Sequence, residues 1–365
     1  MTPTAHRLLS RLKRWDVAVG VLVVVVFVVC GRLVEGVMTG TTVFFTLQDV
    51  GEVLLLALPM TLLIISGEID LSIGSAIALS SCMIGKAYSM GAPMWLACLL
   101  GILTGAAGGA FNGFLVTVLG LGSLAVTIGT LALYRGLAWV LLGSSPVASF
   151  PTSWLQVGYG DLFGWLPLTT PLFVVAIIGF GLLLHGSKTG AAIYAMGTNL
   201  EAARFSGIRT TKIKFNLFLA TGAMAGLCSV TYTLKFATAT PNAALGLELA
   251  VIAAVLFGGV SIFGGVGGLL GSVSAVLFLG LTRAVLRLAD VAPNVLTIVT
   301  GGLLLASVVG PAVLLRLRER REHRRGPQRM PSAGEPHSAP SPVAEVPDDP
   351  VLTEDERHPA PELHP

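Results

Sequence analysis

Two carboxylates, Glu68 and Asp70, interrupt a strongly apolar part of the chain. They lie in the stretch SGEIDLSIGS, residues 66–75, between the apolar runs VLLLALPMTLLII and IALSSCMIG. Acidic side chains in such a place bind an ion or proton, contact a polar ligand, or cap a helix. Asp70 is followed by LSI, which predicts that it caps a helix beginning near Leu71 and faces the positive end of its dipole. A ligand contact is the alternative for Asp70, and Glu68 is predicted either to lie in a wet end loop or to contact a transported molecule.

The composition explains why these carboxylates matter. The 365 residues are 53% hydrophobic and only 12% charged, with a mean hydropathy of +0.81. Soluble domains have about a quarter of charged residues, so 12% is too little to cover a water-facing surface. The four cysteines lie in apolar runs without metal-ligand spacing, so we predict no metal site. The sequence therefore predicts a membrane protein that spans the lipid bilayer several times and binds no nucleic acid.

Ten apolar segments are candidates for membrane spans. Seven have about the 20 residues that a span needs, and three are shorter and interrupted by glycine. Basic clusters at the N-terminus, in the connection 186–212 and after the last segment fall on one side only if the number of spans is even. We predict an all-α polytopic fold with about ten segments, some broken or short, and both termini in the cytoplasm. The segments are 17–36, 44–66, 71–88, 95–119, 124–142, 168–185, 213–234, 249–263, 266–286 and 294–315.

The charge pattern also divides the chain into regions. Residues 1–16 form a basic cytoplasmic arm, 17–315 the transmembrane domain, and 316–325 a basic juxtamembrane segment. Residues 326–365 contain ten prolines and eight acidic residues, a composition that cannot bury enough apolar surface to fold. We predict that this tail is disordered.

A glycine ridge marks the fourth segment. Gly101, Gly105, Gly109 and Gly113 recur every four residues, which places them on one helix face where another backbone can approach closely. We predict that this face packs against a second helix. Asn112 lies beside the ridge and is either an interhelical hydrogen-bonding residue or a ligand contact.

Glycine pairs break a second apolar region, GLELAVIAAVLFGGVSIFGGVGGLLGS at residues 246–272. Short, glycine-interrupted segments in both halves of a transporter point to its translocation path, although close helix packing explains such glycines equally well. We therefore predict a path or gating role for six residues. They are Glu68, Asp70, Ser72, Asn112, Glu248 and Phe263.

The cytoplasmic connection 186–212 contains a capped helix. Thr198 and Glu201 form a capping-box pattern that predicts a helix from Asn199, and Gly207 is placed to end it. Because its side chains are small and basic residues follow it, we predict that this helix docks to a partner protein. The alternative is a loop helix that lies on the lipid surface. Its predicted contact residues are Thr198, Asn199, Glu201, Ala202, Ala203, Arg204 and Gly207.

One nucleotide-binding pattern is only apparent. The stretch GLLLHGSKT at residues 181–189 has Ser187 where a phosphate-binding loop needs lysine directly after the second glycine. We predict no nucleotide site, no cofactor and no enzymatic activity on this chain.

Three stretches together resemble a known family. GEIDLSIGS, GTNLEAARFSGI and GLELAVIAAVLFGGVSIFGG are similar to the permease subunits of bacterial ABC importers for monosaccharides, over about residues 15–315. The first and third stretches look closest to rhamnose-type and autoinducer-type permeases. The sequence departs from the family at RAVLRL, residues 283–288, where such permeases often carry asparagines, so the resemblance gives this helix no sugar contact.

The resemblance implies a function and partners. The chain would move a monosaccharide, such as rhamnose or another pentose or hexose, across the bacterial cytoplasmic (inner) membrane. It would pair with a second permease, as a homodimer or heterodimer, and receive its substrate from an extracytoplasmic sugar-binding protein. An ABC ATPase subunit would bind ATP and Mg and hold the helix at 199–207 in a groove. The alternative is a secondary transporter or channel that uses Glu68 and Asp70 as an ion or proton site and needs no such helix.

Overall fold

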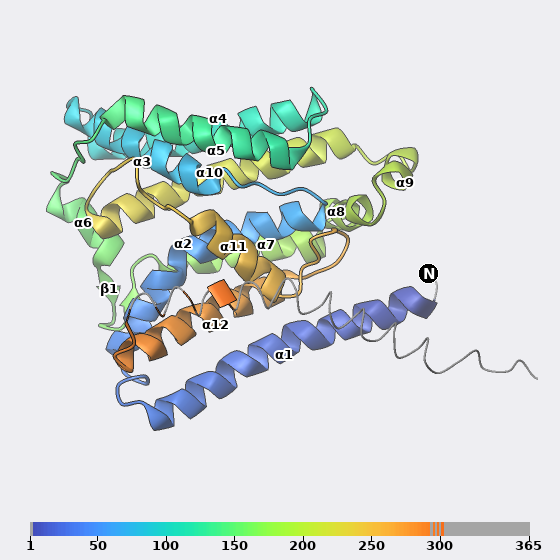
Figure 1. Ribbon diagram of the computed structural model, residues 1–365, viewed down its shortest axis with the longest axis horizontal. Helices are drawn as coiled ribbons and strands as arrows, with labels where there is room; N and C mark the ends of the chain where they lie inside the picture. The colour runs from blue at the N-terminus through green and yellow to red at the C-terminus, as the bar shows by residue number, and fades with distance from the viewer. Residues whose placement is uncertain (1–2, 293–294, 296–297, 299–300, 303–365) are drawn as a thin grey trace, which may run out of the picture. The chain divides into compact units, whose positions relative to one another are not determined.

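The computed structural model describes residues 3–292, 295, 298 and 301–302, with side chains from residue 17 onward. The predicted last span at 294–315, apart from isolated positions, the basic segment 316–325 and the acidic tail 326–365 lie outside the described residues. The described elements are almost all helices (Figure 1). They are α1 (Pro3–Leu33), α2 (Gly40–Ile65), α3 (Ile73–Ser89), α4 (Met94–Thr117), α5 (Ser123–Leu142), α6 (Thr152–Tyr159), β1 (Asp161–Leu162), β2 (Leu166–Pro167), α7 (Thr170–Gly186), α8 (Lys188–Thr198), α9 (Leu200–Phe205), α10 (Thr210–Phe236), α11 (Leu247–Phe257) and α12 (Leu269–Leu288).

The helices are those of a polytopic membrane protein. Among the described residues, α2, α4, α5, α10 and α12 are long and apolar enough to cross a bilayer, and α7 with α8, bent by 69°, is a sixth candidate. The apolar part of α1 and the helix α11 are shorter. Residues 3–16 of the predicted basic arm are helical and continuous with the first apolar run in α1. Ten spans and two cytoplasmic termini stay predictions.

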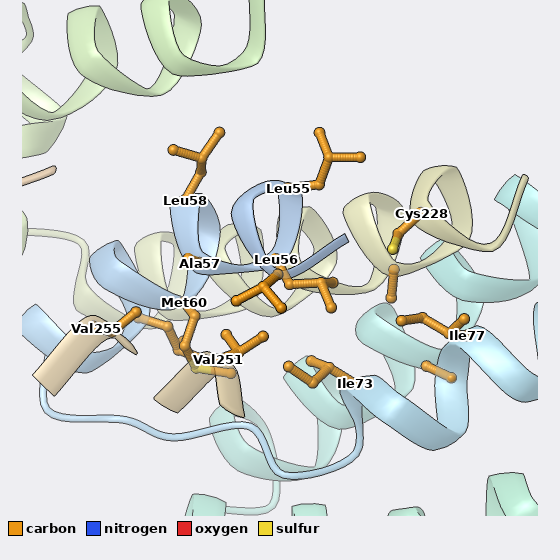
Figure 2. Close-up of a cluster of buried hydrophobic side chains, with 14 of the residues drawn as sticks. Leu55, Leu56, Ala57, Leu58, Met60, Ile73, Ile77, Cys228, Val251 and Val255 are labelled. Atoms are coloured by element: carbon orange, nitrogen blue, oxygen red, sulfur yellow. The ribbon is translucent and has the colours of Figure 1, made fainter. Parts of the chain in front are cut away.

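Helix α2 is the centre of the fold. All residues from Val50 to Ile65 are buried, and a helix that is apolar all round is typical of a position surrounded by other helices. Its neighbours include α7, α8, α10, α11 and α12. In Figure 2, Met60 of α2 lies beside Val251 and Val255 of α11, while Cys228 of α10 lies near Ile77 of α3. The core therefore joins elements from both halves of the chain.

The glycine ridge of α4 lies against two helices. A Cβ atom on Gly105 would lie 2.5 Å from the backbone nitrogen of Gly226 in α10, and one on Gly222 would lie 2.6 Å from Cα of Gly109. A Cβ on Gly101 would instead lie 2.5 Å from Cγ1 of Ile84 in α3. Helices α4 and α10 are in backbone contact because no side chain separates them there, whereas α3 meets the ridge with the side chain of Ile84. The fourth member of the ridge, Gly113, faces Phe215 and Phe218 of α10.

Candidate functional site

The first break in the helices lies between α2 and α3 and contains Asp70. Its side chain is only 1% exposed, and its Oδ1 accepts hydrogen bonds from the backbone nitrogen of Ser72 at 2.8 Å and from Ser72 Oγ at 2.6 Å. The N-cap residue of α3 is Ser72, whose side chain makes no capping bond. The prediction that Asp70 is the N-cap residue of the helix is therefore wrong, because that residue is Ser72. Asp70 instead fixes the turn that precedes the helix, as short polar side chains do in non-helical backbone.

A buried hydrogen-bonded chain continues from Ser72 into two other helices. Asn112 of α4 donates from Nδ2 to Ser72 Oγ at 2.8 Å, and Tyr134 Oη of α5 lies 3.0 Å from Asn112 Oδ1 and 2.8 Å from the carbonyl oxygen of Gly108. We name Asp70, Ser72, Asn112 and Tyr134 the buried polar chain. It links the break to α3, α4 and α5, and in this geometry Asn112 makes interhelical hydrogen bonds.

Glu68 has a partner far away in sequence. Its carboxylate forms an ion pair with Nζ of Lys214, in the second turn of α10, and both side chains are mostly buried, at 12% and 14% exposure. Neither Lys214 nor Tyr134 was among the predicted site residues. Tyr134 and the adjacent Arg135 are polar residues inside an apolar run, which is the signal that identifies them in the sequence.

The second break precedes α11, and the first turn of α11 carries Glu248. Its Oε2 is buried, and it has no hydrogen-bond partner in the described part of the chain. This oxygen lies against Gly74, in the first turn of α3, where a side chain would displace it. Arg135 of α5 donates to the carbonyl oxygens of Pro241 and Ala243 at 2.5 Å and 2.8 Å and interacts electrostatically with Glu248. The first turns of α3 and α11 thus meet, and Glu248 lies close to the start of the helix that follows Asp70.

Phe263 does not join this buried group. It lies in the loop between α11 and α12, and its side chain is 89% exposed. The glycines that follow it, Gly264 and Gly265, both have positive φ angles.

The predicted docking element consists of two helices, α8 and α9. Asn199 is the N-cap of α9, because its side chain accepts from the nitrogen of Ala202 at 3.0 Å. The capping box predicted for Thr198 is wrong. Thr198 is the last residue of α8, and its hydroxyl donates to the carbonyl oxygen of Tyr194 at 2.9 Å. The sequence pattern did not reveal that one helix ends directly before the next begins.

The end predicted for this helix at Gly207 is confirmed. Gly207 has a φ of 80°, and the nitrogens of Gly207 and Ile208 donate to the carbonyl oxygens of Arg204 and Ala203 at 3.0 Å and 3.1 Å. This is a Schellman motif, which glycine favours. On the exposed face of α9, Glu201 and Arg204 form an ion pair of 3.6 Å. Phe205 is 88% exposed, whereas Ala203 is buried.

Glycines connect this element with the break after α2 and with the loop after α11. The nitrogen of Gly265 donates to the carbonyl oxygen of Ile65 at 2.8 Å. A Cβ on Gly264 would lie 3.1 Å from Cα of Gly197 and 3.2 Å from Cα of Gly67. We name Gly67, Gly197, Gly264 and Gly265 the glycine junction. There, the end of α8 lies in backbone contact with the segment after α2 and with the loop after α11.

Comparisons with known proteins identify the family of the chain. Residues 42–308 match the family model described as "Branched-chain amino acid transport system / permease component". The autoinducer 2 import system permease protein LsrD of Yersinia enterocolitica is 30% identical over 307 residues, which cover 82% of this chain and 92% of that protein. LsrD of Escherichia coli K12 is 30% identical over 314 residues, covering 84% and 95%. No solved structure matches the chain. The chain therefore belongs to this family of transport permeases, as a multi-pass permease subunit of the ABC sugar-importer type.

Proposed function

We propose that the chain is the membrane-spanning subunit of an ATP-driven importer in the bacterial cytoplasmic membrane. ATP hydrolysis would take place on an ABC ATPase subunit, with ATP and Mg bound there. A binding protein outside the membrane would deliver the substrate, and a second permease copy or paralogue would complete the path.

The observation that carries this proposal is the geometry of α8 and α9. Helix α9 is capped at both ends by its own residues, Asn199 and Gly207, and presents the exposed side chains of Glu201, Arg204 and Phe205. A surface of this kind fits a groove in a partner protein. The glycine junction gives a movement of α8 and α9 a direct route to the segments that carry Glu68, Asp70 and Glu248, because no flexible side chain lies between the backbones.

The substrate class that we propose is a small polyhydroxylated molecule. The sequence resembles permeases for monosaccharides such as rhamnose and other pentoses or hexoses, and the relatives are named for the import of autoinducer 2. The family model's description instead names branched-chain amino acids. Asp70, Ser72, Asn112, Glu248 and Phe263 are the proposed path or gating residues, with Glu68 beside them.

The other candidate, a secondary transporter with an ion site at Glu68 and Asp70, has less support. Glu68 is paired with Lys214 and Asp70 Oδ1 already accepts two hydrogen bonds from Ser72. An ion or proton would have to displace these partners.

The deciding experiment uses the permease reconstituted with its ATPase and binding protein. We expect one of L-rhamnose, D-ribose, D-xylose or autoinducer 2 to stimulate ATP hydrolysis and to be taken up. Stimulation by leucine or isoleucine alone would overturn the substrate class. Uptake driven by a proton gradient without the ATPase would overturn the ATP-driven mechanism.

A further inference from the structure

Four charged residues gather where α2, α10 and α12 meet. Nζ of Lys235 in α10 lies 3.1 Å and 3.2 Å from the two carboxylate oxygens of Glu52 and 4.0 Å from Oδ1 of Asp49. Arg287 of α12 forms an ion pair with Oδ2 of Asp49. We name Asp49, Glu52, Lys235 and Arg287 the charged cluster. It lies in the N-terminal half of α2 and in the last turns of α10 and α12, on the side predicted to face outward.

Stability alone does not explain the cluster. Its members lie on apolar helices of a chain with only 12% charged residues, and Glu52 is 6% exposed. Burying an ion pair costs desolvation that its attraction often does not recover, so apolar residues of similar size frequently serve stability as well or better. Ionisable residues within membrane spans are usually functional.

The charged cluster lies next to the interface between α2, from the first half of the chain, and α12, from the second half. We call this interface the seam. Asp49 and Arg283, one turn before Arg287, line a cavity of about 10 Å³, the space of a single water molecule. The rest of the cavity wall is apolar and comes from α2, α11 and α12. These wall residues are Val50, Val53, Ala250, Val276, Leu279 and Gly280.

The seam reaches α11, the helix that carries one of the proposed path residues. Ala250 lies two residues after Glu248 in the first turns of α11, so the cavity and the buried Oε2 of Glu248 belong to the same short helix. Widening the seam between α2 and α12 would enlarge this cavity along α11, the helix that also carries Glu248 on another face.

The two ion pairs of the cluster differ in exposure. Glu52 and Lys235, which join α2 to α10, have side chains only 8% and 15% exposed. Asp49 and Arg287, which join α2 to α12, are 33% and 54% exposed. Exposed ion pairs contribute little net stability and break easily, whereas separating a buried pair leaves a charge without a partner. The contact between α2 and α12 is therefore the one that can open.

We propose that the charged cluster is the outer gate of this permease. The Asp49–Arg287 pair holds α12 against α2 and keeps the seam closed, while Glu52–Lys235 keeps α2 and α10 together throughout. When α12 moves away, Asp49, Arg283 and Arg287 become available to the hydroxyl groups of an incoming polar molecule. This inference rests on the proposed import function, because it assigns the outer end of that path.

The test measures access to the seam in intact bacterial cells that express the full-length chain. Cys30, Cys82, Cys98 and Cys228 are replaced by alanine, and Ala250→Cys is labelled with a membrane-impermeant maleimide. We expect slow labelling with the cluster intact. Arg287→Gln and Asp49→Asn should each raise the labelling rate about threefold, which corresponds to about 0.6 kcal/mol, the size expected of an exposed ion pair. Arg287→Lys, which keeps the charge, should stay close to the slow rate.

Two controls separate gating from damage to the fold. Asp161→Asn, in the β1–β2 hairpin, neutralises a carboxylate that accepts from the nitrogen of Gly164 outside the cluster, and it should leave the rate unchanged. A chain that keeps only Cys82, fully buried in α3, should stay unlabelled with Arg287→Gln.

Two results would overturn the proposal. An unchanged rate in Arg287→Gln means that the pair holds no gate, and labelling of Cys82 means that the cluster only maintains the fold. The labelling needs neither substrate nor ATPase. Its rate therefore reports opening of the seam even if the uptake experiment contradicts the proposed function.

Discussion

Asn112 of α4 and Ser72, the residue before α3, are joined by a hydrogen bond of 2.8 Å, and both residues are at most 1% exposed. Through Ser72, this bond connects a helix of the bundle with the carboxylate of Asp70. Non-helical backbone at membrane depth persists only where protein or a water-filled cavity satisfies its polar groups. The buried polar chain thus explains how the break at residues 66–72 is held.

Our first prediction separates the shape of Asp70 from its charge. In Asp70→Asn, the amide oxygen can still accept from the nitrogen and hydroxyl of Ser72, so we expect thermal stability close to that of the unchanged chain. Asp70→Ala leaves buried donors unsatisfied and should cost about 1–3 kcal/mol. Thermal unfolding of the purified permease in detergent measures both. If Asp70→Asn is as unstable as Asp70→Ala, the hydrogen-bonding role assigned to Asp70 is wrong; if it is stable but transports nothing, the charge itself serves transport.

The second prediction concerns the glycine junction. Gly197→Ala places a methyl group against the carbonyl oxygen of Ile65 and the backbone of Gly265, so the end of α8 must move away from the break after α2 and from the loop after α11. We expect the variant to insert and to bind the ATPase while substrate-stimulated ATP hydrolysis falls strongly. The matched control is Gly186→Ala, because nothing lies within 4 Å of a Cβ at Gly186. Full stimulation in Gly197→Ala would show that coupling does not use this contact.

The third prediction distinguishes the two neighbouring candidates for the cap of α9. Asn199→Ala removes the bond to the nitrogen of Ala202 and should cost about 1 kcal/mol of helix stability. Thr198→Val removes only a hydroxyl that bonds within α8, and its effect should be smaller. Hydrogen exchange at the amides of Ala202 and Ala203 reports the difference. Equal exchange in both variants would contradict the assignment of Asn199 as the cap.

The fourth prediction concerns membrane topology. The exposed residues Ser206, just after α9, and Gln156, in α6, are expected on opposite sides of the bilayer. In a chain without its natural cysteines, an impermeant maleimide should label Gln156→Cys in intact cells and should label Ser206→Cys only after the membrane is opened. Labelling of both positions in intact cells would refute the ten-span arrangement.

The sequence predicts the elements of this fold better than it predicts their contacts. Apolar runs and glycines give the spans, and the left-handed position of Gly207 follows from its place after a short helix. The partners of the polar residues are set by tertiary packing. Lys214 is 146 residues from Glu68 and Asn112 is 40 residues from Ser72, and no local pattern encodes such distances.

Two misplacements have local causes. Asp70 and Ser72 are both good capping residues, as are Thr198 and Asn199, so a pattern of residue types cannot choose between near neighbours. For Thr198, the choice depended on α8 continuing to that residue, which the stretch KTGAAIYAMGT, with its two glycines, does not signal. The charged cluster escaped prediction because its members come from three helices, each of which is apolar on average.

The central position of α2 has a consequence for how the protein is made. Glu52 is separated by 183 residues from Lys235, the residue that neutralises it. At a synthesis rate of about 5–20 residues per second, α2 waits about 10–40 s in the membrane before α10 exists. During this interval Glu52 of α2 has no Lys235 to pair with, so α2 is a target for membrane chaperones and proteases. Truncated or slowly translated chains should therefore be degraded from this stage, and a neutral Glu52→Gln helix should survive it longer.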